Sequence, residues 1–167
     1  MNLGRQEKVK LLRLIEEANS NDVEALLQTL LQTLTSYSAR VLENGSTVLH
    51  VAIIAGKIEL AKKLISVMSN VDLKIQDHSG KTALSLAASK GSREIVKSLV
   101  ERDKELLKIP DFAEKIPLVL ACANNHKSLT LYLYSETVPT GILDRGDHVV
   151  FLFRECLRNR MLGRSCV

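Results

Sequence analysis

The sequence contains no Trp, and aromatic residues make up only 4% of its 167 residues. Sheet cores draw heavily on aromatic and β-branched side chains, so this scarcity favours helices packed through small residues. No run of apolar residues approaches the roughly 18 that a membrane-spanning helix needs. The first residues also lack the apolar core of a signal peptide. We therefore expect a soluble, cytoplasmic chain with no direct membrane insertion.

Cysteines are few as well: Cys122, Cys156 and Cys166 form an odd set without the spacing of a metal site. Cys122 falls among small residues, where cysteine behaves as a small apolar side chain. A reducing compartment is the simplest setting for such a chain.

The net charge of +4 is mild, and the C-terminal tail accounts for most of it. The tail's charged residues are Arg154, Glu155, Arg158, Arg160 and Arg164. Nucleic-acid-binding domains normally concentrate basic residues on one face, so we expect no nucleic-acid partner. We interpret the tail as a solvated polar end.

Signatures of catalysis and of cofactor binding are missing too. Glycines occur singly, which excludes a phosphate-binding glycine-rich loop, and no Gly-x-Ser-x-Gly nucleophile motif is present. The histidines His78, His126 and His148 do not form a cluster with metal-ligand spacing. We predict a protein that is not an enzyme, with no catalytic residues, no cofactor and no metal.

What the sequence does contain is a repeated phrase. The segment Gly45–Ala52 returns as Gly80–Ala87, 35 residues later. Each copy is followed by a second glycine, Gly56 or Gly91, and then by a longer amphipathic segment. The pattern predicts a unit of turn, short helix, turn and longer helix. One such unit cannot bury its apolar face alone, so neighbouring units must stack.

Local chemistry supports these helix boundaries. Thr47 and Thr82 are suitable N-caps, because a hydroxyl can accept from a free amide of the first turn. Gly56 and Gly91 can end the short helix in the left-handed conformation. The second helix is marked by the apolar pairs Leu60 with Leu64 and Ile95 with Leu99, after the acidic residues Glu59 and Glu94.

The repeated phrase resembles the ankyrin repeat, which has a period of roughly 33 residues and the signature Thr-Pro-Leu-His-x-Ala. Thr47–Ala52 keeps every element of that signature except the proline. The resemblance implies an all-α, ankyrin-repeat solenoid of stacked helix-turn-helix units with short β-turn or hairpin tips. It also implies that His50 has a structural role, in hydrogen bonds that tie neighbouring repeats together.

On this basis we expect one ankyrin-repeat domain over residues 1–167. Its parts are a divergent repeat at about 5–38, repeats at 39–73 and 74–107, a divergent repeat at 108–138, and a partial fourth repeat with a tail at 139–167. In the divergent third copy, Glu114 replaces the turn glycine and Ile116 the capping threonine, while Pro117 takes the first helical position.

The two ends of the chain are harder to interpret. We expect helices over residues 5–19 and from Val23 to about Thr35, and a linker over 135–141. Residues 145–148 could form another repeat turn before a helix over 149–160. The apolar run Val149–Phe153 either covers the end of the stack or offers a partner contact, since exposed apolar patches usually mark contact sites.

In ankyrin proteins, partners mostly contact the turn tips and the ends of the first helices, on a concave face. Carried over by position, the candidate partner-binding residues are Glu43, Asn44, Ser46, His78, Ser79, Lys81, Ser89, Lys90, Phe112, Lys115 and Asn124. An exposed Phe112 beside lysines would suit an acidic, apolar epitope on a protein partner. The alternative is that these are only the variable, solvent-facing positions of the repeat.

A narrower resemblance is to plant ankyrin proteins of the accelerated-cell-death type, carried by Asn44–Ala52 and Pro117–His126. Those proteins follow their repeats with membrane-spanning helices and serve in defence and stress signalling. The resemblance implies an alternative function, in which a soluble, truncated member pairs with a full-length, membrane-anchored ankyrin relative. A structural scaffold or adaptor without a switch is a further hypothesis.

Overall fold

Short helices joined by tight turns make up the part of the chain that the computed structural model describes, which is residues 5–17, 28, 39–144 and 146–158. Over these ranges the backbone is helical or turned, and an isolated β-bridge joins Arg40 to Thr47. The all-α class expected from the sequence is confirmed. The helix expected from Val23 to about Thr35 lies outside the described residues.

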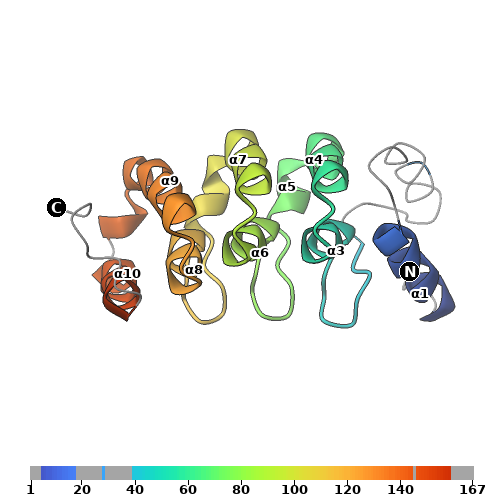
Figure 1. Cartoon of the computed structure of the whole chain (residues 1–167), viewed down its shortest axis with the longest axis horizontal. Coiled ribbons are helices and arrows are strands. Elements are labelled where there is room, and N and C mark those ends of the chain that lie inside the picture. The colour runs from blue at the N-terminus through green and yellow to red at the C-terminus, as the bar shows by residue number, and fades with distance from the viewer. Residues whose placement is uncertain (1–4, 18–27, 29–38, 145, 159–167) are drawn as a thin grey trace. The chain divides into compact units, whose positions relative to one another are not determined.

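Residues 1–83 form a first unit, and residues 84–167 form a second. The first unit contains α1 (Arg5–Glu17), α3 (Val48–Ile54), α4 (Ile58–Val67) and α5 (Asn70–Leu73). Both α1 and α4 pack against α3 (Figure 1). Ile15, Leu49, Leu60 and Leu64 are buried in this unit and form its apolar core.

The second unit is built around α8. Its elements are α6 (Ala83–Lys90, starting at the unit boundary), α7 (Arg93–Arg102), η1 (Lys104–Lys108), α8 (Pro117–Ala123), α9 (Lys127–Thr137), η2 (Val138–Thr140), η3 (Ile142–Asp144) and α10 (Gly146–Arg158). α9, α10 and η1 all pack against α8. The residues Leu118 to Cys122 of α8 are accordingly buried.

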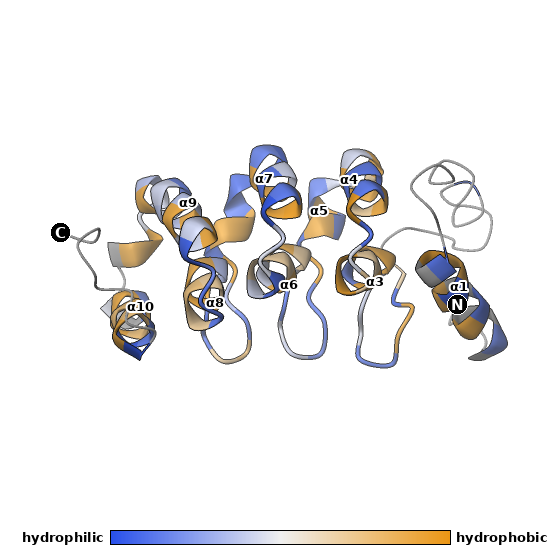
Figure 2. Cartoon of the chain, in the orientation of Figure 1, coloured by the Kyte–Doolittle hydropathy of each residue, from blue (hydrophilic) through white to orange (hydrophobic). Residues whose placement is uncertain are grey.

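The shorter helices α3 and α8 differ from the longer helices α4 and α7 in how much of their surface is apolar. Figure 2 shows α3 and α8 apolar around most of their circumference, whereas α4 and α7 are hydrophilic on one side. In α7 the residues Ile95 and Leu99 are buried, while Arg93 and Lys97 are exposed. This is the pattern of an outer helix that turns one stripe toward the core and the other toward water.

Each short inner helix (α3, α6 and α8) is followed by a residue in the left-handed conformation. The turn that precedes each of these helices, called a tip below, contains a second such residue. The helix-end residues are Gly56 (φ 69°), Gly91 (φ 74°) and Asn125 (φ 60°), and the tip residues are Gly45 (φ 77°), Gly80 (φ 76°) and Glu114 (φ 57°). The glycine positions predicted from the sequence are therefore confirmed. The third copy keeps the same backbone although neither of its two residues is glycine.

The expected linker over 135–141 is wrong. α9 continues to Thr137, whose side chain is fully buried, and η2 follows it directly. Pro139 lies in the first turn of η2, where its missing amide is not needed. The chain turns only at Gly141, which has a φ of 70°.

The expected turn at 145–148 is wrong too, because α10 already begins at Gly146. α10 packs against α8, and His148 and Glu155 are buried on it, with 6% and 3% of their surfaces exposed. Val150 and Phe153 are exposed on the same helix. No residue of the apolar run Val149–Phe153 is buried, so the buried side of α10 comes from residues outside that run.

The strained tip of the third copy gives a stability prediction. Left-handed backbone costs a non-glycine residue about 1 kcal/mol, so Glu114→Gly should raise the free energy of unfolding by about that amount. The neighbouring exposed residue Ala113 does not have a positive φ. Ala113→Gly is therefore the matched control and should lower stability. Urea denaturation of both variants checks the prediction, and a loss of stability in Glu114→Gly would contradict it.

Candidate protein-binding tips

The first tip, residues 40–47 of the first unit, is held by hydrogen bonds along its own backbone. Val41 N–H donates to the carbonyl oxygen of Ser46 over 2.8 Å, and Gly45 N–H donates to that of Leu42 over 3.1 Å. The side-chain oxygen Oδ1 of Asn44 accepts from Ser46 N–H at 3.1 Å. These bonds close the loop and fix the direction of the exposed side chains.

The first tip is also bonded to the second tip, residues 76–82, within the same unit. The backbone N–H of His78 donates to the carbonyl oxygen of Asn44 over 2.8 Å. Arg40 Nη1 donates to the carbonyl oxygens of Gly45 (2.9 Å) and Gln76 (3.0 Å). A Cβ atom at Gly45 would lie 2.5 Å from Arg40 Nη1 and 2.6 Å from the His78 ring, so a side chain there would force both side chains to move.

The second tip and the third tip, residues 111–116 of the second unit, are each held by an aspartate side chain that the sequence analysis did not identify. Asp77 Oδ1 accepts from the N–H groups of Ser79 (2.8 Å) and Lys81 (2.9 Å). Asp111 Oδ1 accepts in the same way from Ala113 (3.0 Å) and Lys115 (2.9 Å). The signal was present in the sequence, since the two aspartates are 34 residues apart and each precedes a lysine by four positions.

His50 links the inner helix α3 to the second tip. Its Nδ1 lies 2.8 Å from Thr47 Oγ1 and accepts from Thr47 N–H at 3.3 Å, and its Nε2 lies 3.1 Å from the carbonyl oxygen of Lys81. Because an amide N–H can only donate, Nδ1 is the acceptor and Nε2 carries the proton. The structural role that the resemblance implied for His50 is thus seen within the first unit.

The electrostatics of this site favour the same neutral form. Burial lowers the pKa of His50 below its ordinary value of 6.5, as desolvation disfavours the charged ring. The Lys81 carbonyl and the carboxylate of Asp77 act in the opposite direction, and burial outweighs them.

In the second unit, the ends of α6 and α8 are joined by side chains. Asn124 Nδ2 donates to the carbonyl oxygen of Leu120 over 2.8 Å and lies 3.4 Å from Ser89 Oγ. His126 Nε2 lies 3.0 Å from the carbonyl oxygen of Ser89. The His126 ring also occupies the space beside Gly91, 2.6 Å from where a Cβ would stand. Two of the expected contact residues, Ser89 and Asn124, are thus brought together.

The expected partner-binding residues differ in how accessible they are. Those exposed are Glu43, Asn44, His78, Ser79, Lys90, Phe112 and Asn124, and those half-buried are Lys81, Ser89 and Lys115. Phe112 stands out, with 72% of its surface exposed. Ser46 is only 1% exposed, so its side chain is not part of the accessible tip. Lys81 belongs to the first unit and Phe112 to the second.

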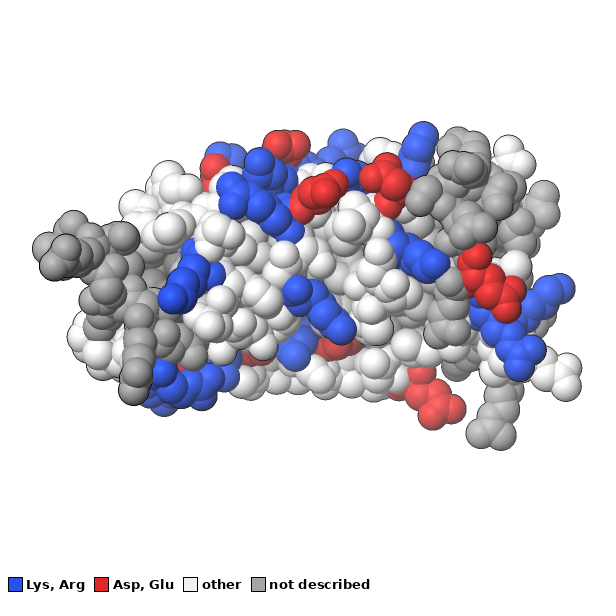
Figure 3. All heavy atoms as spheres, viewed as in Figure 1, with Lys and Arg blue, Asp and Glu red and all other residues white. Residues whose placement is uncertain are grey.

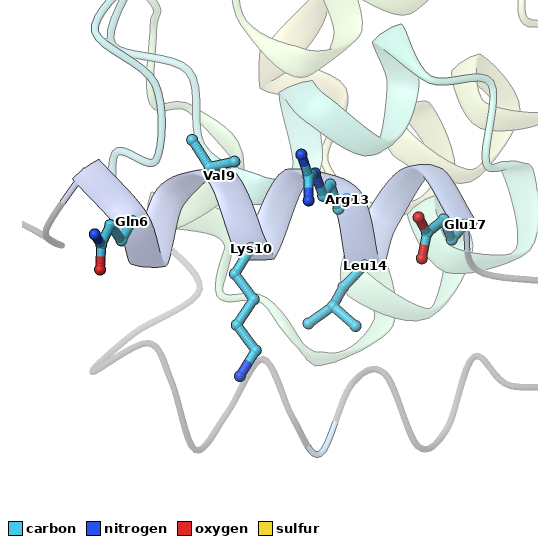
Figure 4. A pocket seen from close by; sticks show the side chains of 6 residues that line it. All are labelled: Gln6, Val9, Lys10, Arg13, Leu14 and Glu17. Carbon is cyan, nitrogen blue, oxygen red and sulfur yellow. The ribbon is translucent and has the colours of Figure 1, made fainter.

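Other surface features of the described residues are weaker. On the face drawn in Figure 3, lysines and arginines stand singly or in small groups with acidic residues between them. A hollow of about 550 Å³ runs along α1, and its described lining comes from that helix alone, including Lys10 and Leu14 (Figure 4). No helix among the described residues is long and apolar enough to cross a membrane. The same residues hold no group of three or more potential metal ligands.

Comparisons with known proteins agree with this helical repeat architecture. A family model described as ankyrin repeats (3 copies) matches residues 4–109 and 67–144. The Notch-regulated ankyrin repeat-containing proteins of Homo sapiens, Mus musculus and Xenopus laevis are each 33% identical to this chain over 95 residues. That alignment covers 55% of this chain and 82% of each relative.

The lowered pKa of His50 predicts how stability depends on pH. As pH falls below 6.5, the unfolded chain takes up a proton on this residue before the folded chain does. The stability that neutral His50 contributes is therefore present above pH 6.5 and is lost as pH falls below it. His50→Gln should lower the free energy of unfolding at pH 7 by about 1–3 kcal/mol, because it disturbs buried hydrogen bonds. It should also flatten the loss of stability between pH 7 and pH 5.

Urea denaturation at several pH values measures both effects. Ser79→Ala is the control, since it replaces an exposed side chain that does not titrate on the adjacent tip and should keep the wild-type pH slope. An unchanged slope in His50→Gln would show that the buried ring does not contribute to the pH dependence.

Proposed function

Because the chain belongs to the ankyrin-repeat family, whose repeats are generally protein-interaction modules, we propose that it is a non-catalytic module that binds a protein partner. The proposed contact surface in the second unit is the third tip, residues 111–116, together with the ends of α6 and α8. In the first unit, considered by itself, the exposed polar groups of the first two tips, among them Asn44, His78 and Ser79, are further candidate contacts.

The observation that carries this proposal is the exposure of Phe112 on a tip with a fixed backbone. Asp111 is buried and holds the tip by accepting from two of its backbone N–H groups, next to Phe112 in the chain. An exposed aromatic ring on a preformed loop loses little conformational freedom when it enters a pocket. Aromatic residues are also enriched among the side chains that dominate binding energy.

The charges around Phe112 suggest the chemistry of the partner. Lys115 is half-buried on the same tip. Glu114 is exposed between Phe112 and Lys115, so the tip presents both signs of charge. The apolar ring therefore supplies the affinity, and Lys115 favours an epitope that places an acidic group beside an apolar pocket.

The narrower alternative, pairing with a membrane-anchored ankyrin relative of the plant accelerated-cell-death type, stays a prediction. Roles in signalling, as an adaptor and in plant defence are further hypotheses. They all use the same proposed contact surface and differ in the partner. The identity of the captured protein distinguishes them.

A photo-crosslinking residue at position 112 tests the proposed surface directly. Placed at Phe112 in the full chain and exposed to native cell extract, it should form a covalent adduct with one partner. The control places the same residue at Leu131, an apolar position on α9 that is 53% exposed in the same unit. Cross-linking there should not give that adduct.

With the partner identified, calorimetry should show that Phe112→Ala weakens binding at least tenfold, which corresponds to a loss of about 1.4 kcal/mol or more. Leu131→Ala should leave the affinity unchanged, and neither substitution should change the melting temperature by more than a degree or two, because both side chains are exposed. Equal affinities for the two variants would exclude the third tip as the contact surface.

A further inference from the structure

Two cysteine thiols meet in the second unit. Cys122 in α8 and Cys156 in α10 have their Sγ atoms 3.4 Å apart. Both are reduced, Cys122 is fully buried, and Cys156 is only half-buried. The two helices that carry them pack against each other. Neither cysteine belongs to a group of potential metal ligands among the described residues.

This geometry is close to that of a disulfide. A disulfide bond is about 2.05 Å long, so the sulfur atoms need to approach by about 1.4 Å, which small side-chain rotations and a slight helix shift can supply. The difference in burial assigns an order to the reaction. A small oxidant reaches the thiol of Cys156 first, and the buried thiol of Cys122 is placed to attack what forms there.

We propose that Cys122 and Cys156 are a redox modification site that forms a reversible intrachain disulfide with a small-molecule disulfide such as oxidised glutathione. The Cys156 thiolate attacks one sulfur of oxidised glutathione, which forms a mixed disulfide and releases one glutathione thiolate. The Cys122 thiol then attacks the Cys156 sulfur and expels the second glutathione, whose departing thiolate takes the proton of Cys122. Two protein thiols are oxidised, and one glutathione disulfide is reduced to two thiols.

The bond would tie α10 to α8 by a covalent link. α10 carries the exposed apolar residues Val150 and Phe153, and its buried side includes Glu155, next to Cys156. The oxidised form therefore holds this helix, with its apolar outer side, in a single position on α8. The reduced form relies on packing alone. This modification is independent of the proposed partner-binding surface.

The test uses the full chain with Cys166→Ser, which removes the third cysteine. After incubation with oxidised glutathione, the chain is unfolded, alkylated and weighed. Both thiols should resist alkylation, and the mass should fall by two hydrogen atoms without retained glutathione. The link closes a long loop, so the melting temperature should rise by about 5–10 °C, and dithiothreitol should reverse both changes.

Two further variants in the same background separate the steps. With Cys122→Ala, the reaction should stop at a glutathione adduct on Cys156. With Cys156→Ser, the buried Cys122 should stay reduced and bind no glutathione. The proposal is overturned if the chain with both cysteines keeps glutathione on Cys156, if both thiols stay open to alkylation, or if the disulfide joins two chains. The first measurement decides the matter even if Cys122→Ala fails to fold.

Discussion

Most helices in the described part of the chain are too short to be stable on their own, and the rest of the structure depends on the packing that stabilises them. α3 and α8 have 7 residues each, and α4 and α7 have 10. Isolated helices shorter than about 12–15 residues are marginal in water. Their stability must come from burial against neighbours, which explains why an inner helix such as α8 is apolar around most of its circumference.

The tips show a second consequence of this arrangement. A loop that leaves the helices must satisfy its own backbone groups, and Asp77 and Asp111 do so by accepting from two N–H groups each. The first tip uses Asn44 instead and bonds to its neighbour through the His78 amide. In the first unit, therefore, the position of the first tip depends on that of the second. The bond from His50 of α3 to the carbonyl oxygen of Lys81 is a further link to the second tip.

The repeated phrase predicted most of this fold because its signals act locally. Glycines with positive φ, the Thr47 cap position and the apolar pairs of the outer helices all depend on residues within one or two turns of the chain. The prediction of a linker over 135–141 was wrong because Pro139, which would interrupt the interior of a helix, fits the first turn of η2. The burial of Thr137 at the end of α9 depends on packing that no local pattern records.

The candidate tips were predictable in position, and their accessibility was predictable only in part. The exposed Phe112 expected from the sequence is 72% exposed, whereas Ser46, expected on the same kind of tip, is buried by the turn. In the third tip Asp111 accepts from the N–H groups of Ala113 and Lys115. The backbone there keeps the left-handed position at Glu114, which glycine would fill more easily. The third copy has thus lost the signature residues of the repeat without losing its geometry. Side chains at 112–114 are free of a structural role, which is the condition under which a tip can acquire a binding one.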